Sequence, residues 1–200
     1  MSVLHSRAKA CTKQPRAFAI LFNILGNQAV WFIAVAAAGN DMAWPGVLAS
    51  AIFVGIFLIM SRAPRVELKL VALAMLCGLV VDGVAASQGW MAYRAALDDG
   101  MAALWILALW AALAVTLTVS FRGLQHRLRW AAVLGGVGGP LAYLAARRGW
   151  GSIALPDPEW VGLLWLGLGW ALALPGLLWA ARHWTAAASC GRDVACRVKS

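Results

Sequence analysis

The stretch from Leu68 to Gln88 reads LKLVALAMLCGLVVDGVAASQ, and its character decides the fold. Lys69 and Asp82 are its only charged residues, and most of the others are apolar or small. A helix needs about 20 such residues to cross a hydrocarbon core that is roughly 30 Å thick. The apolar residues are continuous rather than alternating, so this stretch predicts a transmembrane helix and not a barrel strand.

Five further apolar blocks of similar length flank this stretch. They are Ala17–Ala38, Ala43–Met60, Met101–Ser120, Trp130–Ala146 and Trp160–Ala181. Hydrophobic residues make up 62% of the chain and charged residues 12%, against about 45–50% and about 25% in a soluble domain. Water could not solvate so much apolar surface. We therefore predict an all-α, polytopic membrane helical bundle of about six transmembrane helices.

The distribution of positive charge predicts the orientation of this bundle. The net charge of +9 would raise nucleic-acid binding in a soluble protein, but here the charges lie in tails and short connections. Fourteen of the 17 Lys and Arg residues fall on the side of the bundle that holds both termini. The positive-inside rule then places both termini in the cytoplasm, next to anionic lipid headgroups and without a nucleic-acid partner. We predict a cytoplasmic basic tail over 1–16, a transmembrane domain over 17–184 and a cytoplasmic tail over 185–200.

Asp82 is the one acid that we place inside a span, where a charged side chain costs about 2.5–3.5 kcal/mol. It is either a proton relay or ligand contact, or a hydrogen-bonding group that fixes helix packing. Asn23, Asn27 and Trp31 are spaced four apart, so they form one stripe that faces the bundle. This stripe either forms hydrogen bonds between helices or lines a polar pocket. Its polar residues also favour a retained first helix over a cleaved signal peptide.

Glycine and tryptophan are concentrated in the later blocks. Gly135 and Gly139 are four apart and allow a neighbouring helix to approach closely, while Pro140 bends its helix. This region is either a close-packing face or the wall of a cavity. Six tryptophans fall within spans and either pack or line a pocket: Trp31, Trp105, Trp110, Trp165, Trp170 and Trp179. The sequence around Trp105 and Trp110 resembles the sequence around Trp165 and Trp170. In a chain so rich in apolar residues, chance is a sufficient explanation for this likeness.

No familiar catalytic or metal-binding pattern occurs in the chain. The histidines His5, His126 and His183 are scattered, so the sequence predicts neither a metal site nor an acid–base pair. It contains no phosphate-binding glycine loop and no nucleophile motif, and we predict no cofactor. These absences weigh against an enzyme.

The order of several polar and aromatic residues resembles an uncharacterised family of small bacterial inner-membrane proteins, known only as a domain of unknown function. These residues are Asn23, Gln28, Trp31, Phe32, Trp105, Leu109, Trp110, Ser120, Gly135, Gly139, Pro140 and Tyr143. The resemblance covers about Asn23 to Ala146 and implies a bacterial inner membrane. Because some relatives are encoded near fatty-acid-modifying enzymes, it also hints at lipid metabolism. Relatives often have Asn-His where this chain has Thr118-Val119, which puts in doubt any activity that depends on a histidine there.

We expect a protein that binds or moves an apolar or amphipathic molecule, such as a lipid. Its predicted pocket is formed by Asn23, Asn27, Gln28, Trp31, Asp82, Trp105, Trp110, Gly135, Gly139, Pro140 and Tyr143. A membrane-embedded lipid-modifying enzyme and the substrate-binding subunit of a vitamin transporter are the alternatives. The sequence identifies no protein partner.

Overall fold

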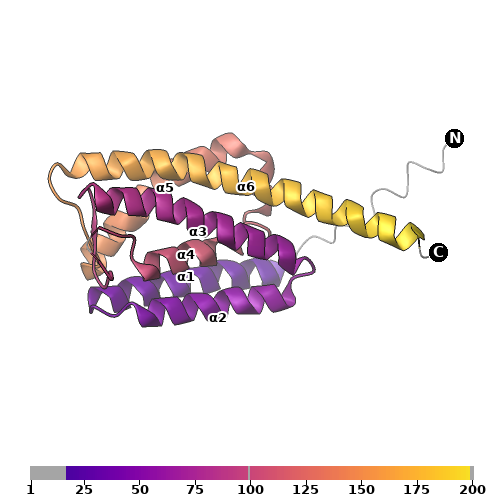
Figure 1. Ribbon diagram of the computed structural model, residues 1–200, viewed down its shortest axis with the longest axis horizontal. Helices are drawn as coiled ribbons and strands as arrows, with labels where there is room; N and C mark the ends of the chain where they lie inside the picture. The colour runs from indigo at the N-terminus through magenta and orange to yellow at the C-terminus, as the bar shows by residue number, and fades with distance from the viewer. Residues whose placement is uncertain (1–16, 99, 199–200) are drawn as a thin grey trace.

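The chain forms an all-α bundle in which successive helices run in opposite directions (Figure 1). The structure, a computed structural model, describes residues 17–98 and 100–198, with side chains described up to residue 188. The predicted basic tail over 1–16 lies outside the described residues. The six α-helices are α1 (Ala17–Gly39), α2 (Trp44–Met60), α3 (Pro64–Ser87), α4 (Leu104–Ala114), α5 (Leu128–Trp150) and α6 (Glu159–Val198).

Three of these helices are long and apolar enough to cross a membrane: α1, α3 and the Glu159–Ala188 part of α6. The helix α2 is apolar but has only 17 residues, and the arginines and glycines of α5 dilute its apolar character. Many large apolar side chains on the outside of the bundle are exposed, among them Ile59 at 87% and Leu172 at 77%. Such an apolar exterior fits a protein that associates with membranes. The helix α6 also continues well past Ala181, where we expected the last span to end.

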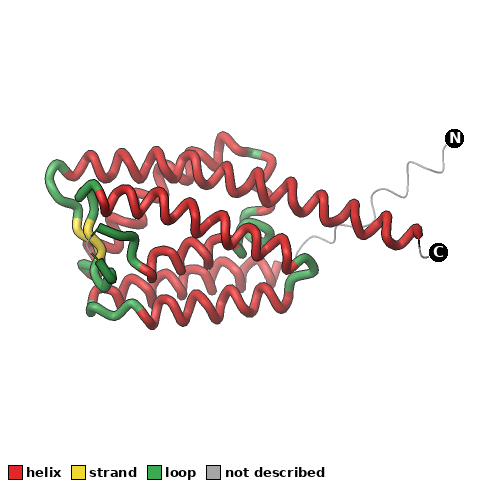
Figure 2. The backbone as a smooth tube through the Cα atoms, in the orientation of Figure 1, coloured by secondary structure: helices red, strands yellow, loops and turns green. Residues whose placement is uncertain are grey.

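The fourth predicted helix, Met101–Ser120, is interrupted in the structure. The helix α4 ends at Ala114, and the chain continues through turns to the short 3-10 helix η1 (Arg122–His126) (Figure 2). With 11 residues, α4 is about 16 Å long and cannot cross a bilayer alone. The expectation of one continuous helix was therefore wrong, although helix and turns together still run the length of the bundle.

Side chains take over the hydrogen bonds that this helix would have made with its own backbone. Asn23 of α1 donates from Nδ2 to the carbonyl of Val115 at 3.3 Å, and Gln125 donates to that of Leu117 at 2.9 Å. The Thr116 hydroxyl donates to the carbonyl of Leu113 at 2.6 Å. Irregular backbone at membrane depth is tolerated where protein groups satisfy it in this way.

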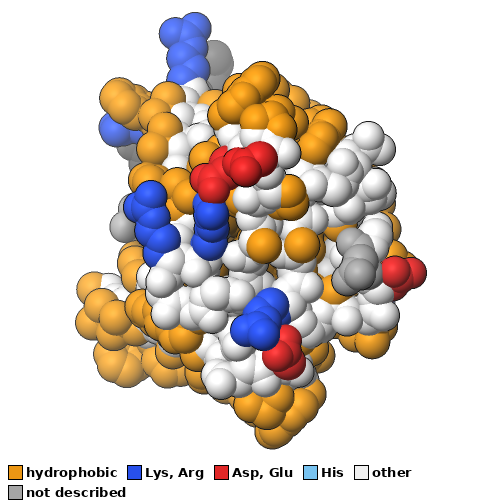
Figure 3. All heavy atoms as spheres, turned by 90° about the vertical axis from the view of Figure 1, so that its left-hand side faces the viewer, with side chains coloured by type: hydrophobic (Ala, Val, Ile, Leu, Met, Phe, Trp, Pro, Cys, Tyr) orange, Lys and Arg blue, Asp and Glu red, His pale blue; other side chains and the backbone are white. Residues whose placement is uncertain are grey.

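A short antiparallel sheet closes one end of the bundle. It joins β1 (Ala92–Tyr93) to β2 (Ile153–Ala154). Acidic and basic side chains gather at this end (Figure 3). Arg94 pairs with Asp41 at 3.1 Å, and Arg147 of α5 pairs with Glu159 of α6 at 2.6 Å.

The most extensive contact between helices is that of α5 with α6, and glycines make it possible. A Cβ atom on Gly135 would overlap the backbone carbonyl of Trp170, and one on Gly139 would overlap the Trp170 indole. The close-packing interpretation of these two glycines is therefore confirmed by their position. The helix α5 touches α1 only slightly. These two helices consequently diverge along part of their length.

We predict that Gly135→Ala destabilises the fold, because the obstructing atom belongs to backbone and cannot rotate away. Overpacking of this kind typically destabilises a fold by about 1–3 kcal/mol. This loss exceeds the stabilisation expected from the higher helix propensity of alanine. Thermal unfolding in detergent should show a lower Tm. Gly138→Ala is the matched control on the same helix, since its Cβ would meet only the Leu134 side chain at 3.9 Å. Equal Tm values for both variants would contradict the close contact.

Candidate functional site

A buried carboxylate, Asp82, connects several elements of the bundle. Its side chain is fully buried in α3 and accepts three hydrogen bonds. The donors are the hydroxyl of Tyr93 at 2.8 Å, the hydroxyl of Tyr143 at 2.5 Å and Nε1 of Trp110 at 2.7 Å. They come from β1, α5 and α4, so one carboxylate ties four elements together. No cation among the described residues takes part, and Arg147 pairs with Glu159.

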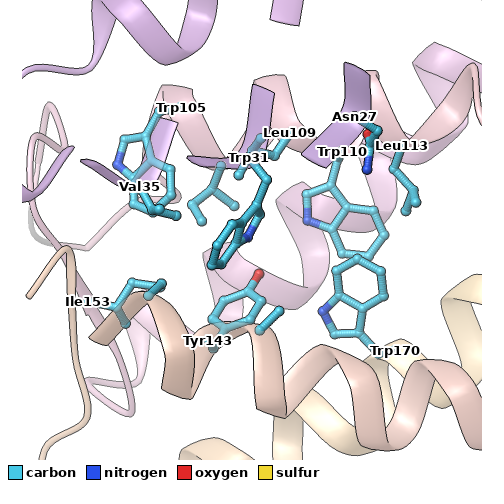
Figure 4. Close-up of a pocket in the computed structure, with 13 residues that line it drawn as sticks. Asn27, Trp31, Val35, Trp105, Leu109, Trp110, Leu113, Tyr143, Ile153 and Trp170 are labelled. Carbon is cyan, nitrogen blue, oxygen red and sulfur yellow. The ribbon is translucent and has the colours of Figure 1, made fainter. Parts of the chain in front are cut away.

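Beside this carboxylate lies a cavity of about 110 Å³ between α1, α4 and α5, which we call the aromatic cavity (Figure 4). Trp31, Trp105, Trp110, Tyr143 and Trp170 form much of its wall. Trp110 and Trp170 stack with their centroids 4.2 Å apart. Tyr143 and Trp110 thus face the cavity while they donate to Asp82, which itself does not line it. The site consequently presents aromatic faces and a hydroxyl, with the carboxylate behind them.

The aromatic cavity adjoins a larger depression where α1 and α5 diverge, which we call the α1–α5 groove. This groove has a volume of about 530 Å³ and is more open to the outside of the bundle. The two hollows share five lining residues: Asn27, Trp31, Leu113, Ala142 and Trp170. The α1–α5 groove is lined by Gly135, Gly138 and Gly139, and it is wide because these residues have no side chains. A molecule could therefore reach the aromatic cavity from the side of the bundle.

Asn27 lies at the junction of the cavity and the groove. Its side-chain amide makes no hydrogen bond to any of the residues that the structure describes, whereas Asn23 one turn earlier bonds to Val115 and Ser120. A polar group without a partner is expensive in a hydrocarbon environment. The Asn27 amide is thus free to bond with a polar atom of a bound molecule or with water.

The predicted pocket residues fall into three groups. Those on the aromatic cavity are Asn27, Trp31, Trp105, Trp110 and Tyr143, and those on the groove include Gln28, Gly135 and Gly139. Asn23, Asp82 and Pro140 line neither hollow. Asn23 supports the interrupted α4 region, Asp82 lies behind the wall, and the Pro140 ring faces α6 near Gly167. That the lining residues bind a ligand stays a prediction.

Trp170 and Ala142 were missing from the predicted pocket, although both line the cavity and the groove. In the sequence, Trp170 was named only among the tryptophans that either pack or line a pocket, and in the structure it stacks on Trp110. The indole N–H of Trp170 is buried near the Tyr143 hydroxyl without a well-formed hydrogen bond. Nothing in the sequence marks Ala142.

Glu67 is a second buried acid, and it lies just before the span predicted from Leu68 to Gln88. It lies in the first turn of α3 and is 8% exposed. Its Oε1 accepts hydrogen bonds from the hydroxyls of Thr118 at 2.8 Å and Ser61 at 3.4 Å, while Oε2 has no partner among the described residues. Glu67 thereby helps to hold the turns that follow α4. Thr118 serves here as a hydrogen-bond donor.

We predict that Asp82→Asn reduces stability more than Tyr93→Phe or Tyr143→Phe. The side-chain amide of the introduced asparagine would place its N–H group against at least one of the three donors and leave buried polar groups without partners. Each tyrosine-to-phenylalanine change removes only one donor. The expected loss for Asp82→Asn is about 2–4 kcal/mol, because hydrogen bonds to charged groups contribute about 1.5–3 kcal/mol each. Thermal unfolding and folded yield in detergent measure it. An unchanged Tm would contradict the linking role of Asp82.

Comparison with known proteins agrees with the resemblance noted in the sequence. No curated protein and no solved structure matches the chain. The profile of a family described as a protein of unknown function (DUF2878) matches residues 20–176, a span that contains most of α1, all of α2 to α5, the aromatic cavity and Asp82. Because this match covers most of the 200 residues, the chain belongs to the DUF2878 family of proteins of unknown function.

Proposed function

We propose that this protein spans a membrane several times and binds an amphipathic, chain-like lipid in the aromatic cavity. The observation that carries the proposal is the unpartnered Asn27 amide at the mouth of an otherwise aromatic and aliphatic hollow. Binding sites for small molecules typically combine a largely apolar wall with a few polar groups that fix orientation. Asn27 and the Tyr143 hydroxyl supply those groups here.

The size of the hollow favours a chain over a bulky ring system. The enclosed part, about 110 Å³, is smaller than an engineered apolar cavity of about 150 Å³ that accommodates benzene. It therefore suits the end of an acyl chain. The remainder of such a molecule would occupy the groove of about 530 Å³, where the glycines of α5 leave room.

The divergence of α1 and α5 supports lateral access from the bilayer. Exposed apolar side chains line the groove on the α5 side, among them Leu134 and Leu141. A lipid chain could pass between these helices without crossing water. A water-soluble ligand would have to cross the same apolar surface, which weighs against the vitamin-transporter alternative.

Filling the junction between cavity and groove should expel the lipid. We predict that full-length protein purified in mild detergent retains a lipid, observed by native mass spectrometry and identified after extraction. Ala142→Phe places a ring where the two hollows meet and should lower the retained fraction about tenfold, equivalent to a loss of about 1.4 kcal/mol of binding. The headgroup and acyl-chain chemistry of the extract would then define the lipid class.

Val137→Phe is the matched control, because Val137 is exposed on the same helix and lines neither hollow. It should retain as much lipid as the unmodified protein. Equal retention by the two phenylalanine variants, or no retained lipid in the unmodified protein, would contradict the proposed site.

We further propose that the bundle lies in a bacterial inner membrane with both termini in the cytoplasm. Support comes from the charges at the two ends of the bundle. The β1–β2 end carries ion-paired Arg94 and Arg147, whereas the basic connections around Arg65 and Arg127 lie at the other end, where α1 begins (Figure 1). The positive-inside rule assigns the more basic end to the cytoplasm.

Fusions to the C-terminus of the full chain should report this orientation. We predict a fluorescent green-fluorescent-protein fusion and an inactive alkaline-phosphatase fusion, because the phosphatase needs disulfides that the reducing cytoplasm does not support. The same two reporters at the N-terminus should give the same result. Active phosphatase at either end would place that terminus outside and contradict the proposal.

A further inference from the structure

A second, chemically different cavity lies at the end of the bundle opposite the β1–β2 sheet. It has a volume of about 470 Å³ and is formed by η1, the start of α5 and the later part of α6. Arg127, Arg129 and Arg182 line it together with His126 and Trp130, and we call it the arginine cavity.

The arginines of this cavity form no ion pair with any acidic side chain that the structure describes. The ion pairs Arg94–Asp41 and Arg147–Glu159 lie at the opposite end of the bundle. Of the residues with described side chains, no Asp or Glu lines the arginine cavity. Three guanidinium groups therefore line one hollow with no described carboxylate among them; they come from α5, α6 and the segment before α5. A bound anion would reduce their mutual repulsion.

The backbone adds to the positive potential at the same place. The helix α5 starts at Leu128, and its N-cap residue, Arg127, makes no side-chain capping hydrogen bond. The first amide N–H groups of a helix lack partners within the helix, and the helix dipole makes this end positive. Backbone and side chains thus favour the same kind of ligand, one with several anionic oxygens.

The position along the helices corresponds to the depth of lipid headgroups. Arg182 follows Glu159 by 23 residues in α6, about 35 Å of helix, which slightly exceeds the thickness of a hydrocarbon core. Trp130 borders the cavity and is 66% exposed, as is typical of tryptophans at a membrane interface. Leu134, one turn further along α5, is exposed and lines the α1–α5 groove.

We propose that the arginine cavity binds a phosphate group. Guanidinium groups bind phosphate oxygens through paired, charge-assisted hydrogen bonds, and basic pockets between transmembrane helices bind anionic headgroups. The phosphate could belong to a glycerophospholipid or be free in solution. The neighbouring Trp130 and Leu134 favour the lipid, whose chains would lie along the exposed face of α5.

Native mass spectrometry of the full-length protein in uncharged detergent tests this site. The probes are dioleoyl phosphatidylglycerol, dioleoylglycerol, which lacks the phosphate, and millimolar inorganic phosphate as a competitor. We expect phosphatidylglycerol to bind more tightly than dioleoylglycerol. Arg127→Gln/Arg129→Gln should weaken that binding about thirtyfold, since each basic residue near a membrane surface contributes about fivefold.

Arg65→Gln/Lys69→Gln is the matched control, because it removes two exposed charges at the same end of the bundle outside the cavity. It should leave the affinity within about threefold. Arg182→Gln, on a different helix, tests the site independently should the double variant fold poorly. Displacement of the lipid by inorganic phosphate would identify free phosphate as an occupant, and no displacement would identify the lipid.

Equal binding of phosphatidylglycerol and dioleoylglycerol would overturn the proposal. So would equal losses in the double variant and its control. Because the variants of the arginine cavity and Ala142→Phe of the aromatic cavity act on separate residues, failure at one site leaves the other intact.

Discussion

The architecture depends on one constraint, the satisfaction of the buried Asp82 carboxylate. Its three donors come from a helix, a strand and a second helix that are distant in the chain but have to converge on the same point. Removing a carboxylate from water is costly unless such partners surround it. The positions of α4 and α5 relative to α3 are therefore coupled to this group, and so are the rings of Trp110 and Tyr143 that form part of the aromatic cavity.

This coupling explains how a bundle made mostly of Leu, Ala and Gly can hold a defined cavity. Aliphatic side chains alone would repack to fill an empty space. Here two of the wall rings are held from behind by hydrogen bonds, and Trp170 is held against α5 by the close approach at Gly135 and Gly139. The hollow is maintained because its walls are anchored to groups outside it. The polar centre and the binding surface are consequently two sides of the same structure.

The helices that are defined by continuous apolar runs were predictable from the sequence, whereas features that depend on contacts between distant residues were not. The bounds of α1 and α3 are close to those expected, because continuous apolar runs define them. The break after Ala114 was not predictable, since Asn23 and Gln125 stabilise it from elsewhere in the chain. Asp82 was recognisable because a charged side chain inside a transmembrane segment is energetically unfavourable. Its partners were not predictable, since Tyr93 lies in a connection and Tyr143 is 61 positions away in the sequence. Five of the predicted pocket residues line the aromatic cavity, while Ala142 has no feature that distinguishes it from other alanines.

The interruption after α4 also bears on how the polypeptide is assembled. In hydrocarbon, the carbonyls of Val115 and Leu117 would have no partner until Asn23 and Gln125 are in place. The fourth segment is thus a poor candidate for independent integration by the translocation machinery. Its stable placement requires the first helix to be present already and the residues of η1 to have been synthesised. In the proposed multi-pass arrangement, the folding of this segment and its integration into the membrane would therefore be one event.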